Sequence, residues 1–336
     1  MIASTARHCC RRLACAALAV ALQILAPPSS FADTPPQFSI EKKYLEVSVV
    51  VDNALKPFAG LFANCLAEGK TWADKANADT TAQWRADPKS FRGMQWSYDR
   101  VYDLRSVIGR YVSIVRSDST FEGGAHPNQE IDTVLWDAVA QKRINIRPFF
   151  TETADNGPTM TALARSAQLA VAAAKLANGI NGYGDDDTPA SKLTPEQELR
   201  QDSFIRGGIK PKLLEVGPVT LAPSTESGKS AGLTFHYSPY EVGPYVEGPY
   251  TIFVPWTDFR RYLSSEGVAL FGGAQPKSDA VTTPTPSGGS YRRPTITPRC
   301  AAPSSRPRSR ARLRPWQSRS APAGGRPIRC GGRRCA

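Results

Sequence analysis

After its first 32 residues, the 336-residue sequence has no run of eighteen consecutive apolar residues, so no later segment is predicted to span a membrane. Histidine is also scarce. Of three in all, only His126 and His236 follow residue 32. Neither these histidines nor the carboxylates form a cluster with metal-ligand spacing, so we expect no metal and no cofactor.

Acidic residues are absent from segments 1–32 and 291–336, although these two segments hold 16 of the 42 Lys and Arg residues. The other 26 basic residues share residues 33–290 with all 30 acids, which gives this region a small negative charge. The net charge of +12 therefore comes from the two ends and not from a basic patch on the part that can fold. We predict no nucleic-acid partner.

Cysteine is nearly absent from the same central region. Of seven cysteines, Cys65 alone lies between residues 33 and 290, so no internal disulfide is expected there. The apolar neighbours Leu61, Phe62 and Leu66 predict a buried free thiol.

The first 32 residues have the order of a secretory signal peptide. Arg11 and Arg12 precede an apolar run at 13–26, and a small-residue site follows at 30–32. We therefore expect a mature protein that begins near Asp33, is periplasmic or secreted, and has no stable membrane anchor.

The C-terminal residues divide into a linker, 274–290, and an Arg- and Pro-rich tail, 291–336. The tail has too few large apolar groups to offset its ordering entropy, so we predict disorder. It could bind acidic glycans or lipid surfaces, be a solvated extension without a role, or be the product of a frameshift. We favour the frameshift, because Arg, Pro, Ala and Gly all have GC-rich codons.

Residues 33–273 are predicted to form one α+β domain, or two subdomains at about 33–110 and 111–273. Strand patterns joined by short polar turns indicate an antiparallel sheet, with helices packed on one side. An Asp-rich stretch, 185–187, lacks the spacing of a calcium loop and is expected to be solvated. The predicted strands are 45–51, 213–221, 232–237 and 250–256 with a meander over 95–150, and the predicted helices are 53–76, 159–177, 194–205 and a short one ending near 265.

The first candidate motif is FEGGAHPN, residues 121–128. Gly123 and Gly124 allow a turn with positive φ, and Pro127 keeps the preceding residue extended, so a shaped loop leading into a strand is expected. We interpret His126 as structural, with a ring nitrogen bonded to a backbone carbonyl that braces this loop.

The second candidate motif is YEVGPYVEGPY, residues 240–250, in which each Gly-Pro pair predicts a stiff, extended backbone. Tyrosines on such a backbone suit a recognition loop, because they combine apolar area with a hydroxyl group. Contact and packing roles remain equally open for Tyr240 and Tyr245, whereas Tyr250 begins a strand pattern and is expected to pack.

The first motif is followed by the segments 134–136 and 144–150, and the second lies between 233–239 and 252–256. Together, and in this order, these segments resemble the RsiV-like extracytoplasmic domain over about residues 41–262. That domain occurs in lysozyme-sensing anti-sigma factors and beside the catalytic domain of some peptidoglycan deacetylases. The resemblance implies a binding module that contacts lysozyme. The chain lacks the sigma-binding segment, the membrane span and the deacetylase metal motif, so neither signalling nor deacetylation is carried over.

We therefore predict an exported envelope module that binds a macromolecule, either a lysozyme-like protein or peptidoglycan glycan. The alternative is a peptidoglycan or polysaccharide hydrolase or deacetylase, but no nucleophile-elbow motif or helical carboxylate pair supports catalysis. The predicted binding residues are Glu122, Gly123, Gly124, His126, Pro127, Asn128, Tyr240, Glu241, Gly243, Pro244, Tyr245 and Glu247.

Overall fold

A computed structural model describes residues 34–181 and 189–277. The predicted signal peptide, the Asp-rich stretch 185–187 and the basic tail lie outside the described residues. The domain boundaries expected from the sequence therefore stay predictions. No helix in the described part of the chain combines the length and apolarity needed to cross a bilayer.

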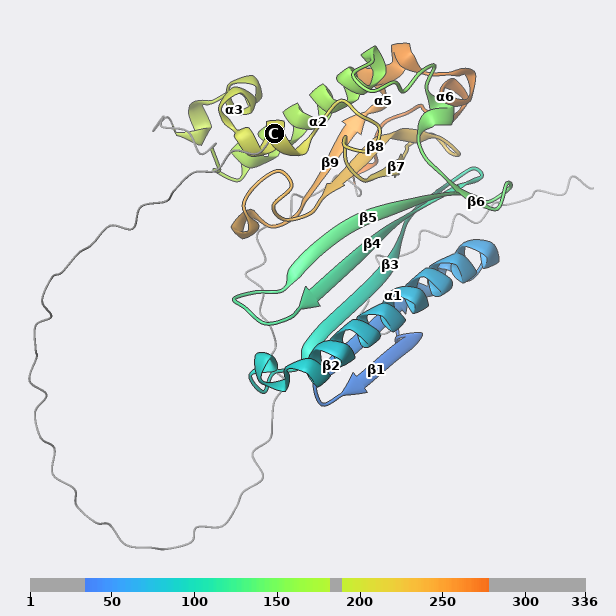
Figure 1. The fold of residues 1–336 in the computed structure, drawn as a ribbon. Helices are drawn as coiled ribbons and strands as arrows, with labels where there is room; N and C mark the ends of the chain where they lie inside the picture. The colour runs from blue at the N-terminus through green and yellow to red at the C-terminus, as the bar shows by residue number, and fades with distance from the viewer. Residues whose placement is uncertain (1–33, 182–188, 278–336) are drawn as a thin grey trace, which may run out of the picture. The chain divides into compact units, whose positions relative to one another are not determined.

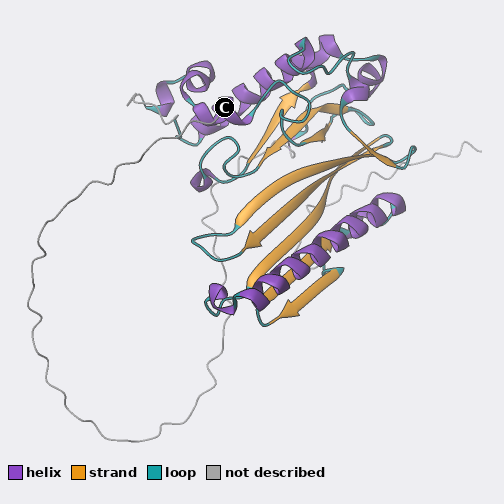
Figure 2. Ribbon diagram, viewed as in Figure 1, coloured by secondary structure: helices purple, strands orange, loops and turns teal. Residues whose placement is uncertain are grey.

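The first sheet has six strands in the order β1-β2-β3-β4-β5-β6 (Figures 1 and 2). The predicted meander is confirmed, because β3 to β6 pair antiparallel in succession. The sheet is mixed, however, since β2 and β3 run parallel and α1 forms the crossover between them. The elements are β1 (Phe38–Lys42), β2 (Leu45–Val51), α1 (Ala59–Ala86), β3 (Trp96–Ile108), β4 (Tyr111–Phe121), β5 (Asn128–Asp137) and β6 (Lys142–Ile144).

The second sheet has three antiparallel strands, β7-β8-β9, which follow a helical segment. The α+β class is thus confirmed, but the helices do not share one side: α1 packs on the six-stranded sheet and α2 on β9. The elements are α2 (Pro158–Ala177), α3 (Pro195–Gln201), α4 (Ser203–Gly208), β7 (Val219–Pro223), β8 (Ser230–Tyr237), β9 (Tyr250–Pro255), α5 (Trp256–Phe259) and α6 (Ser265–Leu270).

Several helix and strand boundaries differ from those predicted, and nearby residues explain the differences. The first helix starts six residues later than expected, after Pro57, and continues to Ala86 before Pro88. The helix expected at 194–205 is divided at Asp202, whose carboxylate accepts a hydrogen bond from the Ile205 N–H and caps α4. Strand β7 starts only after Pro218, because proline cannot donate to the ladder.

Two hydrophobic clusters lie on opposite faces of β3 to β5, because successive side chains along a strand alternate in direction. Val112 and Ile114 pack with α1, whereas Ser113 points the other way and accepts a hydrogen bond from the Leu221 N–H of β7 at 3.1 Å. Ser106 donates to the Leu221 carbonyl at 2.7 Å. Buried serines therefore join the first sheet to β7.

Cys65 of α1 is a buried free thiol, as predicted. Burial raises its pKa to about 12, so very little reactive thiolate exists near neutral pH. We expect iodoacetamide to alkylate Cys65 in the native protein at least about a thousandfold more slowly than in urea at pH 8. Mass spectrometry of the tryptic peptide that contains Cys65 measures this ratio, and equal labelling with and without urea would contradict the burial.

Candidate functional site

The two predicted motif segments lie against each other although they are more than a hundred residues apart in the sequence. The first is the turn between β4 and β5, and the second is the loop between β8 and β9. The Tyr245 ring stacks on the His126 ring, with centroids 3.7 Å apart and planes inclined by 15°. The Tyr245 hydroxyl also donates to the Pro127 carbonyl at 2.9 Å. The fold therefore unites the two segments in one surface.

His126 braces its own loop, and this prediction is confirmed. Its Nδ1 lies 3.0 Å from the Pro127 carbonyl oxygen, which can only accept, so Nδ1 must carry the proton. Nε2 is then free to accept, and the Tyr240 hydroxyl lies 3.5 Å from it. The imidazole thereby links the first motif to both tyrosines of the second.

Tyr240 is the most exposed member of this group, with 55% of its surface accessible. Its φ of 74° is in the left-handed region, which is unfavourable for an aromatic residue and marks a conformation that the surrounding structure enforces. Its ring centroid is 5.5 Å from that of Tyr245 and 6.4 Å from that of His126. We call His126, Tyr240 and Tyr245 the aromatic patch.

A tight turn beneath Tyr240 holds it in place. The Ser238 N–H donates to the Glu241 carboxylate, and the Glu241 N–H donates to the Ser238 carbonyl at 3.1 Å. Gly208 of α4 lies under this turn, and a Cβ there would come within 1.9 Å of the Glu241 carbonyl oxygen. Burial raises the pKa of the Glu241 carboxyl. Glu241 thus shapes the turn as well as contributing charge.

Glu247 points inward, where its carboxylate lies 3.2 Å from Lys175 Nζ. The same ammonium is 2.6 Å from Asp202, and the three side chains are at most 3% exposed. The Tyr250 hydroxyl also donates to Glu247 at 2.7 Å, in agreement with the predicted packing role of Tyr250. Gly243 is buried above this group, and a Cβ there would meet both Glu247 and Lys175. These residues support the loop from within.

The second motif is not extended throughout, contrary to prediction. Pro244 is extended, but Tyr245–Glu247 form one turn of 3-10 helix, in which the Glu247 N–H bonds to the Pro244 carbonyl at 3.0 Å. Within this turn Glu247 faces Lys175, and Tyr245 stacks on His126.

The remaining predicted residues shape the first loop. Gly123 and Gly124 have φ values of 94° and 111°, which confirms the expected positive-φ turn. Glu122 accepts a hydrogen bond from the Tyr98 hydroxyl at 2.6 Å, and burial together with this carboxylate raises the pKa of Tyr98. Asn128 is exposed at the first position of β5.

Four residues that support the site escaped the sequence analysis: Ser238, Gly208, Lys175 and Asp202. Only Lys175 could have been identified from the sequence. It lies four residues after Val171, on the apolar face of the predicted second helix, where a lysine is out of place unless it is paired. Its two partners come from distant segments that no spacing rule connects.

Among residues 34–181 and 189–277, neither histidine is hydrogen-bonded to a serine, a cysteine or a carboxylate side chain. His236 is buried, with Nε2 2.9 Å from the Thr220 hydroxyl, and burial lowers its pKa to about 3. The Ser238 hydroxyl accepts a hydrogen bond from the Ile131 N–H at 2.9 Å. Within the same ranges no group of three or more His, Cys, Asp or Glu side chains is placed to hold a metal ion.

Comparison with known proteins gives one family match. Residues 224–257 match a family described as "Protein of unknown function (DUF3298)", and this stretch contains β8, the second motif and β9. A DUF3298 family member from Bacteroides fragilis is similar in structure at 15% identity, with a TM-score of 0.42 over 70% of this chain and 97% of that one. A DUF3298 protein from Pseudomonas aeruginosa has 17% identity and a TM-score of 0.43 over 69% and 90%. No curated protein matches the sequence.

Proposed function

We propose that this protein is an exported module of the cell envelope, periplasmic or secreted, that binds a lysozyme-type protein through the aromatic patch. The observation that carries the proposal is the convergence of both motif segments on His126, Tyr240 and Tyr245. The RsiV-like resemblance of those segments supplies the partner class.

The physical properties of the patch support recognition. Tyr245 is already ordered by stacking and by its bond to Pro127, so little side-chain entropy remains to be lost on binding. Tyr240 offers an exposed ring and hydroxyl, the combination that is common in recognition loops. The excess of acids in residues 33–290 favours a basic partner and faster association with it.

Tyr240→Ala and Tyr245→Ala are each expected to weaken lysozyme binding about tenfold or more, because central aromatic residues dominate interface energies. Biolayer interferometry with immobilised lysozyme and the full-length protein measures the effect. Tyr245→Ala should show the larger loss, since it also removes the support of His126.

Val139→Ala is the matched control, because Val139 is 71% exposed on the β5–β6 turn and lies outside both motifs. It should bind lysozyme like the wild type.

Other outcomes would favour a different function. If the protein does not bind lysozyme but sediments with insoluble peptidoglycan, the ligand of the patch is a glycan. Release of soluble fragments or acetate from the wall would favour the hydrolase or deacetylase alternative. Undiminished lysozyme binding by both tyrosine variants would refute the role of the patch.

A further inference from the structure

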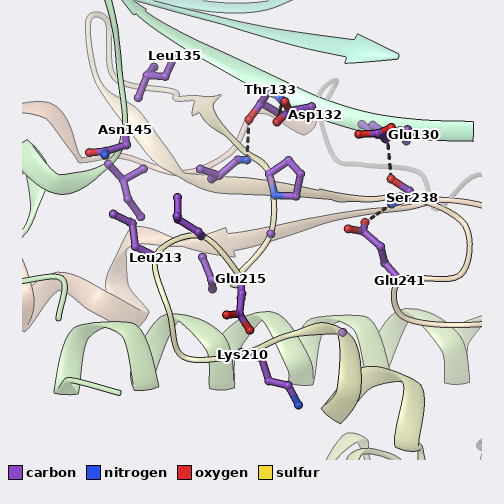
Figure 3. A pocket seen from close by; sticks show the side chains of 18 of the residues that line it. Glu130, Asp132, Thr133, Leu135, Asn145, Lys210, Leu213, Glu215, Ser238 and Glu241 are labelled. Atoms are coloured by element: carbon purple, nitrogen blue, oxygen red, sulfur yellow. Dashed lines mark hydrogen bonds between the residues drawn. The ribbon is translucent and has the colours of Figure 1, made fainter. Parts of the chain in front are cut away.

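A cleft of about 550 Å³ lies beside the aromatic patch, between β5 and the segment 207–219 (Figure 3). Ser238 and Glu241, from the turn beneath Tyr240, close one end of it. Its volume is in the range of sites that hold a ligand or a few residues of a peptide. The cleft therefore borders the turn that carries Tyr240 of the patch.

One wall of the cleft is an incompletely paired strand. β5 pairs with β4 along its whole length, but β6 pairs with β5 only at residues 135–137. Residues 128–134 thus have no strand on their outer side within the described part of the chain. A free strand edge of this kind presents backbone groups that can pair with an added strand.

Side chains cap this edge in place of a strand. The Ile131 N–H donates to the Ser238 hydroxyl at 2.9 Å, and the Thr133 N–H donates to the Asp132 carboxylate at 2.7 Å. The Thr133 hydroxyl accepts from the Val219 N–H at 3.0 Å. The first two contacts satisfy the Ile131 and Thr133 N–H groups, and an incoming backbone carbonyl could replace either of them.

The floor of the cleft is apolar. Leu135, Ile146 and Val216 are buried there, and Ile131 and Ile144 are half-buried. Such a floor suits the alternate apolar side chains of an extended peptide, which project from one face of a strand.

The end nearest the patch has an uncompensated negative charge. Asp132 is paired with Arg116 at 3.1 Å, and Glu215 with Lys212 at 2.7 Å. Glu130 and Glu241 have no such cation among the described residues. In addition to burial, Glu130 and Asp132 help to raise the pKa of the Glu241 carboxyl. A positive charge placed here would relieve this repulsion.

We propose that the cleft receives an extended, basic segment of the partner protein, which lies along the free edge of β5 and places an Arg or Lys side chain between Glu130 and Glu241. The inference rests on the proposed function for its partner class, since it adds a second contact region next to the aromatic patch. It requires only that the occupant be a polypeptide with a cationic residue among apolar neighbours.

An array of synthetic heptapeptides tests this directly. The peptides have apolar residues at alternate positions and Arg, Lys, Ser or Glu at the centre, and the probe is the fluorescently labelled full-length protein. We expect Arg and Lys peptides to bind at least about tenfold better than Glu peptides. Because the whole chain has a net charge of +12, non-specific attraction would give the opposite preference.

Glu130→Lys should abolish the preference for cationic peptides, whereas Glu46→Lys, at an exposed position of the inner strand β2, should retain it. Equal binding of cationic and anionic peptides, or an unchanged preference in Glu130→Lys, would overturn the proposal. Self-association of the wild type that Glu130→Lys removes, measured by analytical ultracentrifugation, would identify a second copy as the occupant and also overturn it.

The experiments distinguish an error in the proposal for the cleft from an error in the proposal for the aromatic patch. Tyr245→Ala should leave peptide binding within about twofold of wild type while it weakens lysozyme binding. Selective peptide binding without lysozyme binding would reject the proposed function and retain the cleft. Lysozyme binding that depends on Tyr245, without selective peptide binding, would retain the proposed function and reject the cleft as a binding site.

Discussion

Lys175→Met is expected to lower the free energy of unfolding by about 3–5 kcal/mol, the range seen when one partner of a buried ion pair is removed. Lys175 is fully buried and faces Asp202 at 2.6 Å and Glu247 at 3.2 Å. Methionine fills a similar volume but leaves two buried carboxylates facing each other without the charge between them. Urea unfolding followed by circular dichroism measures the loss.

The control is the same substitution in an exposed pair. Lys70 lies 2.6 Å from Asp74, but both side chains are more than half exposed, so Lys70→Met should cost less than about 0.5 kcal/mol. Replacing both carboxylates as well, in Lys175→Met with Asp202→Asn and Glu247→Gln, should restore part of the stability. A loss below about 1 kcal/mol for Lys175→Met alone would show that the ammonium does not hold these segments together.

The same substitution should also weaken the site. Glu247 belongs to the turn that carries Tyr245, so loss of its inward ion pair frees this turn from α2. Lysozyme binding should therefore fall in Lys175→Met under conditions in which circular dichroism still shows a folded protein. This result would separate positioning of the patch from simple unfolding.

Acidification is expected to destabilise the protein through His236. Burial lowers the pKa of this histidine to about 3 in the folded protein, whereas its unfolded value is 6.5. Between pH 6.5 and pH 3, His236 is therefore protonated in the unfolded chain but neutral in the folded protein. The free energy of unfolding consequently decreases as the pH falls from 6.5 toward 3. By linkage the loss from this group is about 3 kcal/mol at pH 4.

Other titratable groups change the free energy of unfolding with pH in the opposite direction. Burial raises the pKa of Asp103 to about 6, so its contribution is greatest at low pH and is lost as the pH rises through 6. The measurement is therefore the difference between wild type and His236→Gln in urea unfolding from pH 4 to 7.5. The difference should shrink as the pH falls. Thr220→Val removes the hydrogen-bond partner but not the titrating group, so it should keep the slope of the wild type.

Local patterns predicted most of the elements. Alternation of apolar residues indicated β2 and the strands of the meander, and the helix predicted at 159–177 ends where α2 ends. The positive φ of Gly123 and Gly124 also followed from residue type. These features depend on neighbours in the sequence, so a single sequence contains the information.

The candidate site was predictable as two segments but not as a surface. Tyr240 and Tyr245 were equally compatible with packing and with contact, and their exposure depends on where His126 lies. The inward direction of Glu247 could not be foreseen, because its partner Lys175 is on another helix. Such side-chain choices are decided by groups that chain folding brings near.

By itself, the sequence determined the α+β class, the order of most strands and helices, the charge difference between the central region and the tail, and the two motifs that become the loops. Only the tertiary structure decided the parallel pairing of β2 with β3, the stacking of Tyr245 on His126, the buried Lys175 network and the open edge of β5. The reason is physical: periodicity and turn chemistry act between near neighbours, whereas pairing partners and buried charges depend on contacts between distant residues.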